Sequence, residues 1–370
     1  MNNTMNLSKK RKSKKLTKTF KNNMITYGMV ICAFAVMQVL LSAGKVSSLM
    51  EGLLVPLCTY AILAVSLNLT VGILGELSLG HAGFMCVGAF ASAFFSKCME
   101  GSITVSWLRF GIAILLGAFI AGIFGILIGI PVLRLKGDYL AIVTLAFGEI
   151  IKNLMNILYI GRDSNGFHFS VTSTMDLNMG EDGVILVKGA QGITGTPNDS
   201  TFTIGVILLL ITLFIVLNLI HSRDGRAIMA IRDNTIAAES VGINITKYKL
   251  MAFSISAAMA GAAGALYAHN LSTLTASPKN FGYNMSIMIL VFVVLGGIGN
   301  IRGSIISAVL LTLLPELLRG LNNYRMLIYS IVLIAMMLFN WAPKCIEWRE
   351  RHSLKNLKAR FGRKKTKEAR

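Results

Sequence analysis

The sequence predicts an all-α membrane protein, a polytopic transmembrane helical bundle of about ten spans within a range of eight to ten. The chain is 54% hydrophobic and only 14% charged, with a mean hydropathy of +0.65, whereas soluble domains are about a quarter charged. Several apolar runs approach the ~20 residues that cross a bilayer as helix. Long runs without alternation, such as Phe202–Ile220, exclude a β-barrel.

Ten candidate spans follow in order. They are Met24–Ala43, Leu53–Val71, Leu79–Phe95, Trp107–Val132, Tyr139–Leu158, Phe202–Ile220, Leu250–His269, Met285–Ile298, Ile305–Leu318 and Leu327–Trp341. Ten crossings place both termini in the cytoplasm, together with Arg134, Lys136 and the 222–249 loop, as the positive-inside rule favours. If the Gly-rich Leu79–Phe95 and the polar Tyr139–Leu158 are both re-entrant, the count falls to eight and Arg134 and Lys136 move outside.

The net charge of +19 is concentrated in two tails. The first 21 residues carry eight basic residues and no acid, and the chain from Ala342 onward carries eleven against three acids. Each tail therefore contributes +8 and the remainder only +3. Basic flanks beside apolar spans indicate a cytoplasmic location and attraction to anionic membrane lipid, and argue against nucleic acid as a partner.

These features divide the chain into a basic cytoplasmic tail (1–23), a transmembrane domain (24–341) and a second basic cytoplasmic tail (342–370). The transmembrane domain carries the 222–249 loop on the cytoplasmic face and a polar 159–201 loop on the external face. We expect the external loop to be irregular and able to meet an extracellular partner. A simple connector is the alternative.

No catalytic motif is present. The G-x-x-x-x-G-K-[ST] pattern that cradles nucleotide phosphates is absent, as are H-E-x-x-H and a nucleophile elbow, and the five cysteines show no metal or redox spacing. The sequence therefore predicts a protein that is not an enzyme, with no catalytic residue, cofactor or metal of its own. Small-residue spacings predict close helix packing, as in Gly125-x-x-x-Gly129 and Ala260-x-x-x-Gly264.

The 222–249 loop is the most informative segment. Asp224-Gly225 predicts a turn ahead of a short helix, and small residues follow at Ala237, Ala238 and Gly242. The polar rim of that helix is formed by Arg223, Arg226, Arg232 and Asp233. A helix with small side chains on one face can pack closely into a groove of another protein. An ordinary amphipathic surface helix is the alternative.

Polar or flexible residues near the spans are candidates for a conduit or its gating backbone, because polar groups are costly at membrane depth. These candidates are Gly80, His81, Gly83, Gly137, Asp138 and Glu149. A hydrogen-bonded packing role is the alternative for His81, and an interfacial position is the alternative for Glu149.

Four long blocks in order resemble a known family. They are LSLGHAGFMCVGAFASAF (Leu77–Phe94), GDYLAIVTLAFGEIIKNLMN (Gly137–Asn156), Ser222–His269, and LGGIGNIRGSIISAVLLTLLPELLR (Leu295–Arg319). They are similar to the M-type permease subunits of high-affinity branched-chain amino acid ABC importers. The resemblance covers most of Leu53–Trp341 and leaves out both basic tails.

The resemblance implies a multi-pass subunit of the bacterial cytoplasmic membrane. Its implied partners are a second related permease chain, two ABC ATPase subunits that hydrolyse the ATP, and an external substrate-binding protein that delivers leucine, isoleucine or valine. It also implies that Arg226–Gly242 is the ATPase-docking element. The residues implied to couple the subunits are Arg226, Ala237, Ala238, Glu239 and Gly242.

The sequence departs from the family's pattern in several places, and one of them is the absence of the later I-x-L-P of the docking pattern. The docking pattern E-A-A-x-x-x-G has Ile236 in place of its glutamate, and the external S-N-G-I run appears as Ser164-Asn165-Gly166-Phe167. Two other functions stay open. Permeases that import urea or short-chain amides are closely similar, and a stand-alone ion-coupled secondary transporter is an alternative of another class.

Overall fold

The computed structural model describes residues 18–44, 47–135, 137–163, 166–177, 179–180 and 183–341. The chain divides into two compact units, Met1–Val46 and Ser47–Arg370. The described part of the first unit is helix α1 (Lys18–Ser42). Most of the first basic tail, all of the second, Lys136 and the first two residues of the Ser164–Phe167 run lie outside the described residues.

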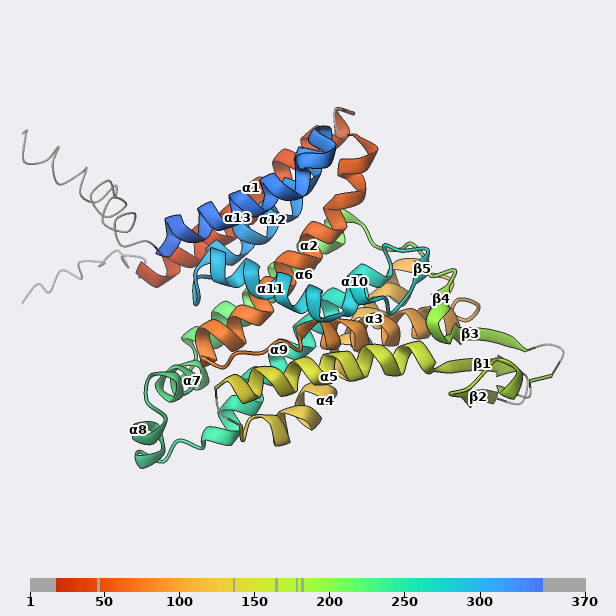
Figure 1. Cartoon of the computed structure of the whole chain (residues 1–370), viewed down its shortest axis with the longest axis horizontal. Coiled ribbons are helices and arrows are strands. Elements are labelled where there is room, and N and C mark those ends of the chain that lie inside the picture. The colour runs from red at the N-terminus through yellow and green to blue at the C-terminus, as the bar shows by residue number, and fades with distance from the viewer. Residues whose placement is uncertain are drawn as a thin grey trace, which may run out of the picture. The chain divides into compact units, whose positions relative to one another are not determined.

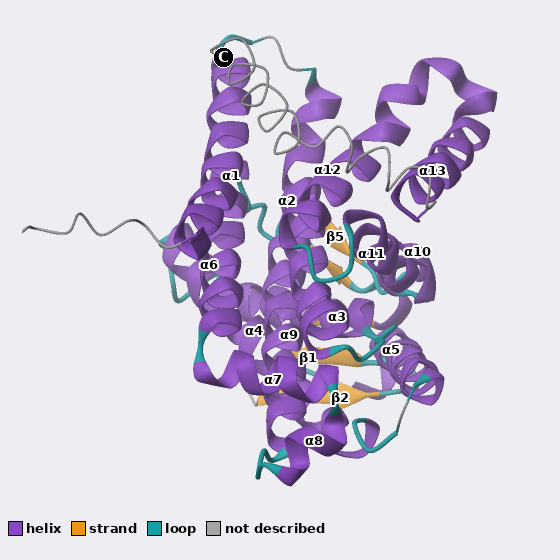
Figure 2. Cartoon of the chain, turned by 90° about the vertical axis from the view of Figure 1, so that its left-hand side faces the viewer, coloured by secondary structure: helices purple, strands orange, loops and turns teal. Residues whose placement is uncertain are grey.

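The second unit is a bundle of helices with few strands (Figure 2). Its long helices are α2 (Ser48–Asn68), α3 (His81–Cys98), α4 (Ser106–Val132), α5 (Asp138–Ile157), α6 (Phe202–His221), α9 (Ile245–Ala268), α11 (Tyr283–Gly296), α12 (Ile301–Leu317) and α13 (Arg325–Trp341). Its short helices are α7 (Arg223–Asp233), α8 (Thr235–Ser240) and α10 (Pro278–Phe281). A π-helical turn, Leu69–Leu74, extends α2, and the 3₁₀ turns are Met175–Leu177, Gly189–Gln191 and Leu318–Tyr324.

Eight helical segments of the described chain are long and apolar enough to cross a membrane. They include α1, α2 with its π-helical turn, α4, α5, α6 and α9. These segments confirm the prediction of a helical protein with several membrane-spanning segments. Helix α3, with 18 residues, and α13, with 17, are not among the eight.

Helices α3, α4 and α9 pack closely through small residues, as their spacings predict. A Cβ atom added to Gly125 of α4 would lie 2.7 Å from the Cβ of Ala257 in α9. One added to Gly264 of α9 would lie 2.1 Å from the carbonyl oxygen of Met85 in α3. The helix axes therefore approach more closely than larger side chains would allow.

The segment between α5 and α6 is not an irregular loop, so that prediction is wrong. It contains β1 (Tyr159–Asp163), β2 (Gly166–Ser170) and β3 (Val184–Lys188) in an antiparallel sheet of order β2-β1-β3. A further pair joins β4 (Ile193–Thr194) to β5 (Thr273–Leu274), which follows α9. Pairing satisfies backbone groups that a loose loop would leave to water.

The strands β1–β3 and the helices α7 and α8 lie at opposite ends of the second unit (Figure 1). Helix α3 ends beside the strands, where Lys97 Nζ donates to the carbonyl of Thr194 and Arg162 Nη1 donates to the carbonyl of Cys98 at 3.2 Å. Helix α9 begins near α7 and continues to β5. The bundle therefore has one end with the helical 222–249 loop and another end with the sheets.

Candidate functional site

The 222–249 loop contains two short helices, each begun by its own cap. The Ser222 hydroxyl accepts the N–H of Gly225 at 3.0 Å, and the Asn234 side-chain oxygen accepts that of Ala237 at 3.0 Å. Such caps satisfy amide groups that have no partner inside the helix. The predicted turn at Asp224-Gly225 is wrong, because both residues lie in the first turn of α7, where the Asp224 charge suits the helix dipole.

Helix α7 is fixed against the bundle. Ile228 and Ile231 are only 0% and 1% exposed, and a Cβ added to Gly225 would lie 2.0 Å from a carbonyl oxygen of α6. Arg226, one of the predicted coupling residues, is exposed and donates from Nη1 to the carbonyl of His221 at 3.1 Å. One side of α7 is thus part of the core while Arg226 lies at the surface.

The predicted coupling residues in α8 and the turn after it differ in exposure. Ala237, Glu239 and Gly242 are exposed, whereas Ala238 is 4% exposed and faces the chain itself. Gly242 has a φ of +84°, in the left-handed region that favours glycine, and no atom of the described residues lies within 4 Å of a Cβ added there. Glycine at this position therefore permits the turn after α8 and is not required for space.

Two large apolar side chains of this segment face outward. Ile236 is 81% exposed and Val241 is 75% exposed. Sequence reasoning treated Ile236 only as a departure from the docking pattern and did not single out Val241. The spacing of apolar residues along the sequence could not have identified this pair, because α8 has only 6 residues and too few turns to show an apolar stripe.

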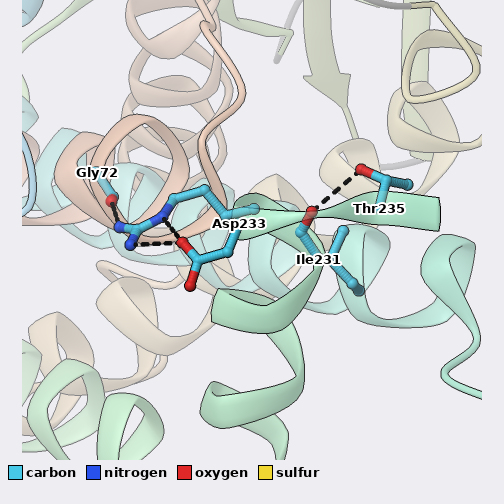
Figure 3. A network of polar contacts seen from close by, with 5 residues as sticks. Gly72, Ile231, Asp233 and Thr235 are labelled. Carbon is cyan, nitrogen blue, oxygen red and sulfur yellow. Dashed lines mark hydrogen bonds and ion pairs between the residues drawn. The ribbon is translucent and has the colours of Figure 1, made fainter. Parts of the chain in front are cut away.

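Arg232 joins α7 to the end of α2 and so does not form a free polar rim. Its Nη1 donates to the carbonyl oxygen of Gly72 at 2.8 Å, and its Nε and Nη2 lie 3.3 and 3.1 Å from a carboxylate oxygen of Asp233 (Figure 3). The Thr235 hydroxyl donates to the carbonyl of Ile231 at 3.1 Å, which ties the start of α8 to α7.

The segment that Arg232 reaches is the α2–α3 junction, which we define as Leu69–Gly80. Its second contact with the 222–249 loop is an ion pair between Glu76 and Lys249, whose side chains are 16% and 10% exposed. Removing one partner of an ion pair buried to this degree strongly destabilises the fold, because the other charge is left buried without a partner. The loop therefore contacts the junction through two charged side chains, one at the end of α7 and one in the first turns of α9.

Gly80 and Gly83 lie where α3 crosses α5. Cβ atoms added to them would lie 2.6 Å from the Thr144 carbonyl oxygen and 2.7 Å from the Gly148 Cα. His81 between them is 1% exposed, with Nε2 2.9 Å from the Ser66 hydroxyl. The structure thus gives these three residues packing contacts, and their role in a conduit stays a prediction.

The other conduit candidates belong to α5. Gly137 has a φ of +60° with nothing near an added Cβ, and Asp138 is exposed in the first turn. Glu149 pairs with Lys152 and accepts the backbone N–H of Tyr283 at 2.7 Å, which joins α5 to α11. The structure brings Glu149 near Gly80 and Gly83 through the α3–α5 crossing, and it leaves Gly137 and Asp138 at the far end of the helix.

The described residues form a multi-pass helical membrane protein with a helical loop at one end of the bundle. The family model described as "Branched-chain amino acid transport system / permease component" matches residues 49–339. The high-affinity branched-chain amino acid transport system permease protein LivM of Salmonella typhimurium strain LT2 is 36% identical over 294 residues, or 77% of this chain and 67% of that protein.

The LivM protein of Escherichia coli K12 is 35% identical over 294 residues, with the same coverage of 77% and 67%. The LivH permease protein of Salmonella typhimurium strain LT2 is 24% identical over 258 residues, or 68% of this chain and 79% of that protein. No solved structure matches the chain. The chain therefore belongs to the family of permease components of branched-chain amino acid transport systems.

Proposed function

We propose that this chain is the permease subunit of an ABC importer that moves leucine, isoleucine and valine inward across the bacterial cytoplasmic membrane. The observation that carries the proposal is the family match over residues 49–339, which includes all of the bundle from the first turn of α2 to the last turn of α13. The relatives named LivM support the same cargo class. ATP hydrolysis is assigned to separate ATPase subunits.

The ATPase subunit docks on α8. Ile236 and Val241 supply the apolar contact, since large exposed apolar side chains gain most from burial at an interface. Ala237, Glu239 and Gly242 border that contact, and Ala238 holds α8 against the chain. Arg226 lies on the exposed side of α7 and adds a charged contact. A second related permease presents an equivalent loop to the second ATPase subunit.

The membrane domain of residues 24–341 crosses ten times, with both termini in the cytoplasm. Support comes from α3, which runs from the junction beside α7 to the strands although its hydropathy is modest. At ~1.5 Å per residue its 18 residues span ~27 Å. The loop with α7 and α8 is then cytoplasmic, the sheets of 159–201 face the external binding protein, and the basic tails (1–23 and 342–370) meet anionic lipid.

Two groups of residues serve the conduit in this proposal. Glu149, with Gly137 and Asp138 on the same helix, contributes polar groups on α5. Gly80, His81 and Gly83 form the gating backbone, because a crossing without side chains lets α3 shift against α5.

The test is uptake of low-concentration labelled leucine by cells that lack this gene and by the same cells carrying it. Isoleucine, valine and urea serve as separate competitors. We expect leucine uptake to require the gene and to be inhibited by isoleucine and valine but not by urea. Inhibition by urea alone would instead indicate the amide-importing function and overturn the cargo.

A second measurement separates the importer from an ion-coupled transporter. The proton gradient is collapsed while cellular ATP is held constant. An ABC importer keeps its uptake, whereas a secondary transporter loses it. Loss of uptake under this condition would contradict the proposal.

A further inference from the structure

We propose that Arg232 is a positioning residue that transmits movement of the docked α7–α8 segment to the α2–α3 junction. The inference rests on the proposed function, because it concerns how the ATPase-docking loop acts on the rest of the same subunit. Its basis is one long-range contact, from the Arg232 guanidinium on α7 to the Gly72 carbonyl oxygen at the end of α2.

The Gly72 carbonyl needs a donor from outside its own helix. The last carbonyl groups of a helix have no partner within it, and they carry the negative end of the helix dipole. Nearby, the Thr70 carbonyl accepts two N–H groups, those of Gly75 and Glu76. The Gly72 carbonyl accepts the Arg232 guanidinium, and a cation is the donor best suited to this end of a helix.

The Arg232 side chain also lies directly against the junction. A Cβ added to Gly75 would be 2.5 Å from the Arg232 Cγ, so the arginine stem occupies the space that glycine leaves. The contact is therefore both a charged hydrogen bond and a close packing contact. Movement of α7 cannot leave the end of α2 unaffected while both persist.

The junction is linked onward to other helices. The fully buried side chain of Asn68 accepts the N–H of Gly299 at 2.8 Å and donates to the Ser304 hydroxyl at 2.9 Å. A Cβ added to Gly72 would lie 1.9 Å from that Asn68 oxygen. The end of α2 thus meets the start of α12 on one side and Arg232 on the other.

The Glu76–Lys249 pair holds the other part of the junction to the start of α9. Past Glu76 the junction continues to Leu79, whose backbone N–H donates to the Thr144 hydroxyl of α5 at 3.0 Å, and α3 begins two residues later at His81. A displacement of α7 is therefore passed to α2, α12 and the start of α3 through named contacts. Because proximity alone does not demonstrate energetic coupling, the coupling between ATP hydrolysis and transport has to be measured.

The test uses the whole importer, with both permease chains and both ATPase subunits, in proteoliposomes with its binding protein. The ratio of labelled leucine imported to ATP hydrolysed is measured for wild type, Arg232→Gln and Arg223→Gln. Arg223 is the matched control, because it is an exposed arginine at the opposite end of α7. We expect Arg232→Gln to lower the ratio about tenfold and Arg223→Gln to leave it within about twofold of wild type.

A glycine pair breaks the same contact from the other side. Gly75→Ala places a methyl group against the Arg232 stem at a backbone φ of +83°. Gly195→Ala is the control, since its φ of +70° imposes similar strain with nothing within 4 Å of the added atom. We expect Gly75→Ala to lower the ratio as Arg232→Gln does, and Gly195→Ala to leave it unchanged. Arg232→Lys, which keeps one donor for the Gly72 carbonyl, should restore part of the ratio.

The outcomes separate this inference from the function on which it rests. If wild type hydrolyses ATP but imports no leucine, the proposed cargo is wrong. If wild type imports leucine and both Arg232→Gln and Gly75→Ala keep its ratio, the inference alone is overturned. Equal losses of import and hydrolysis, in proportion to the amount of assembled complex, would show that Arg232 only stabilises the subunit and would likewise overturn it.

Discussion

Helices α7 and α8 are neighbours in one loop, yet they relate to the protein in opposite ways. Helix α7 buries Ile228 and Ile231 completely and extends Arg232 to the end of α2. Helix α8 buries Ala238 alone, while Ile236 just after its start and Val241 just after its end are exposed. The same stretch of sequence thus contains one helix fixed by its own chain and another that offers apolar surface.

This difference suits the docking of an ATPase subunit that we propose for the loop. Covering an exposed apolar surface, such as that of Ile236 and Val241, with a second protein lowers the free energy. A helix fixed by core contacts and one long-range hydrogen bond moves together with the elements it contacts. We infer that α8 is the part that binds and α7 is the part that transmits.

The largest effect should come from placing a charge on the buried side of α7. We expect Ile228→Asp to prevent accumulation of folded protein, because losing a packed Ile costs about 2–5 kcal/mol and an unpaired buried carboxylate adds to that loss. The measurement is the yield of monodisperse protein after detergent extraction. Ile228→Val, which removes one methyl group, is the control and should extract normally. Normal yield of Ile228→Asp would show that α7 is not part of the core.

The next effect should come from the same charge on α8. Ile236→Asp leaves the fold intact, because this side chain is already in solvent. It should weaken association with the ATPase subunits about tenfold or more, since the interface loses the burial of one large apolar side chain. Co-purification with those subunits is the measurement, and Ile236→Leu is the control. If Ile236→Asp co-purified like wild type, α8 would not be the docking helix.

The smallest effect should come from the cap that separates the two helices. Asn234→Ala removes the acceptor for the Ala237 N–H and should destabilise α8 by about 1 kcal/mol. Hydrogen exchange should quicken in α8 and stay unchanged in α7. Asn234→Asp keeps an acceptor and should behave as wild type. Equal quickening in both helices would mean that α7 and α8 form one cooperative unit.

A comparison of helices α4 and α3 shows how far hydropathy alone could predict the membrane-spanning helices. Helix α4 has a mean hydropathy of 2.7, so it was evident from the sequence. Helix α3 contains His81, Ser92 and Ser96, all buried within the bundle, and it is not among the eight apolar segments. A helix surrounded by protein can carry polar groups that meet partners there, as when Ser96 lies 2.7 Å from His269 Nε2.

Composition singled out the segment in which α7 and α8 lie, but it did not predict their internal arrangement, nor that α9 already begins at Ile245. Nothing in the order of residues showed that Ala238 faces inward, that Gly242 serves a left-handed turn, or that Ile236 replaces a polar residue with an apolar surface. Likewise, polar composition indicated an irregular external loop, whereas the strands there are defined by pairing between segments distant in sequence.

The sequence by itself determined that this is a multi-pass helical protein, where its apolar helices lie, and to which family it belongs, because hydropathy and motif blocks are local properties of the chain. Only the tertiary structure decided that Arg232 meets Gly72, that Glu76 pairs with Lys249, and that Gly80 and Gly83 lie at a crossing of α3 and α5. Each of these contacts joins residues from separate helices. Their partners are fixed by packing in three dimensions, which the linear order of residues does not specify.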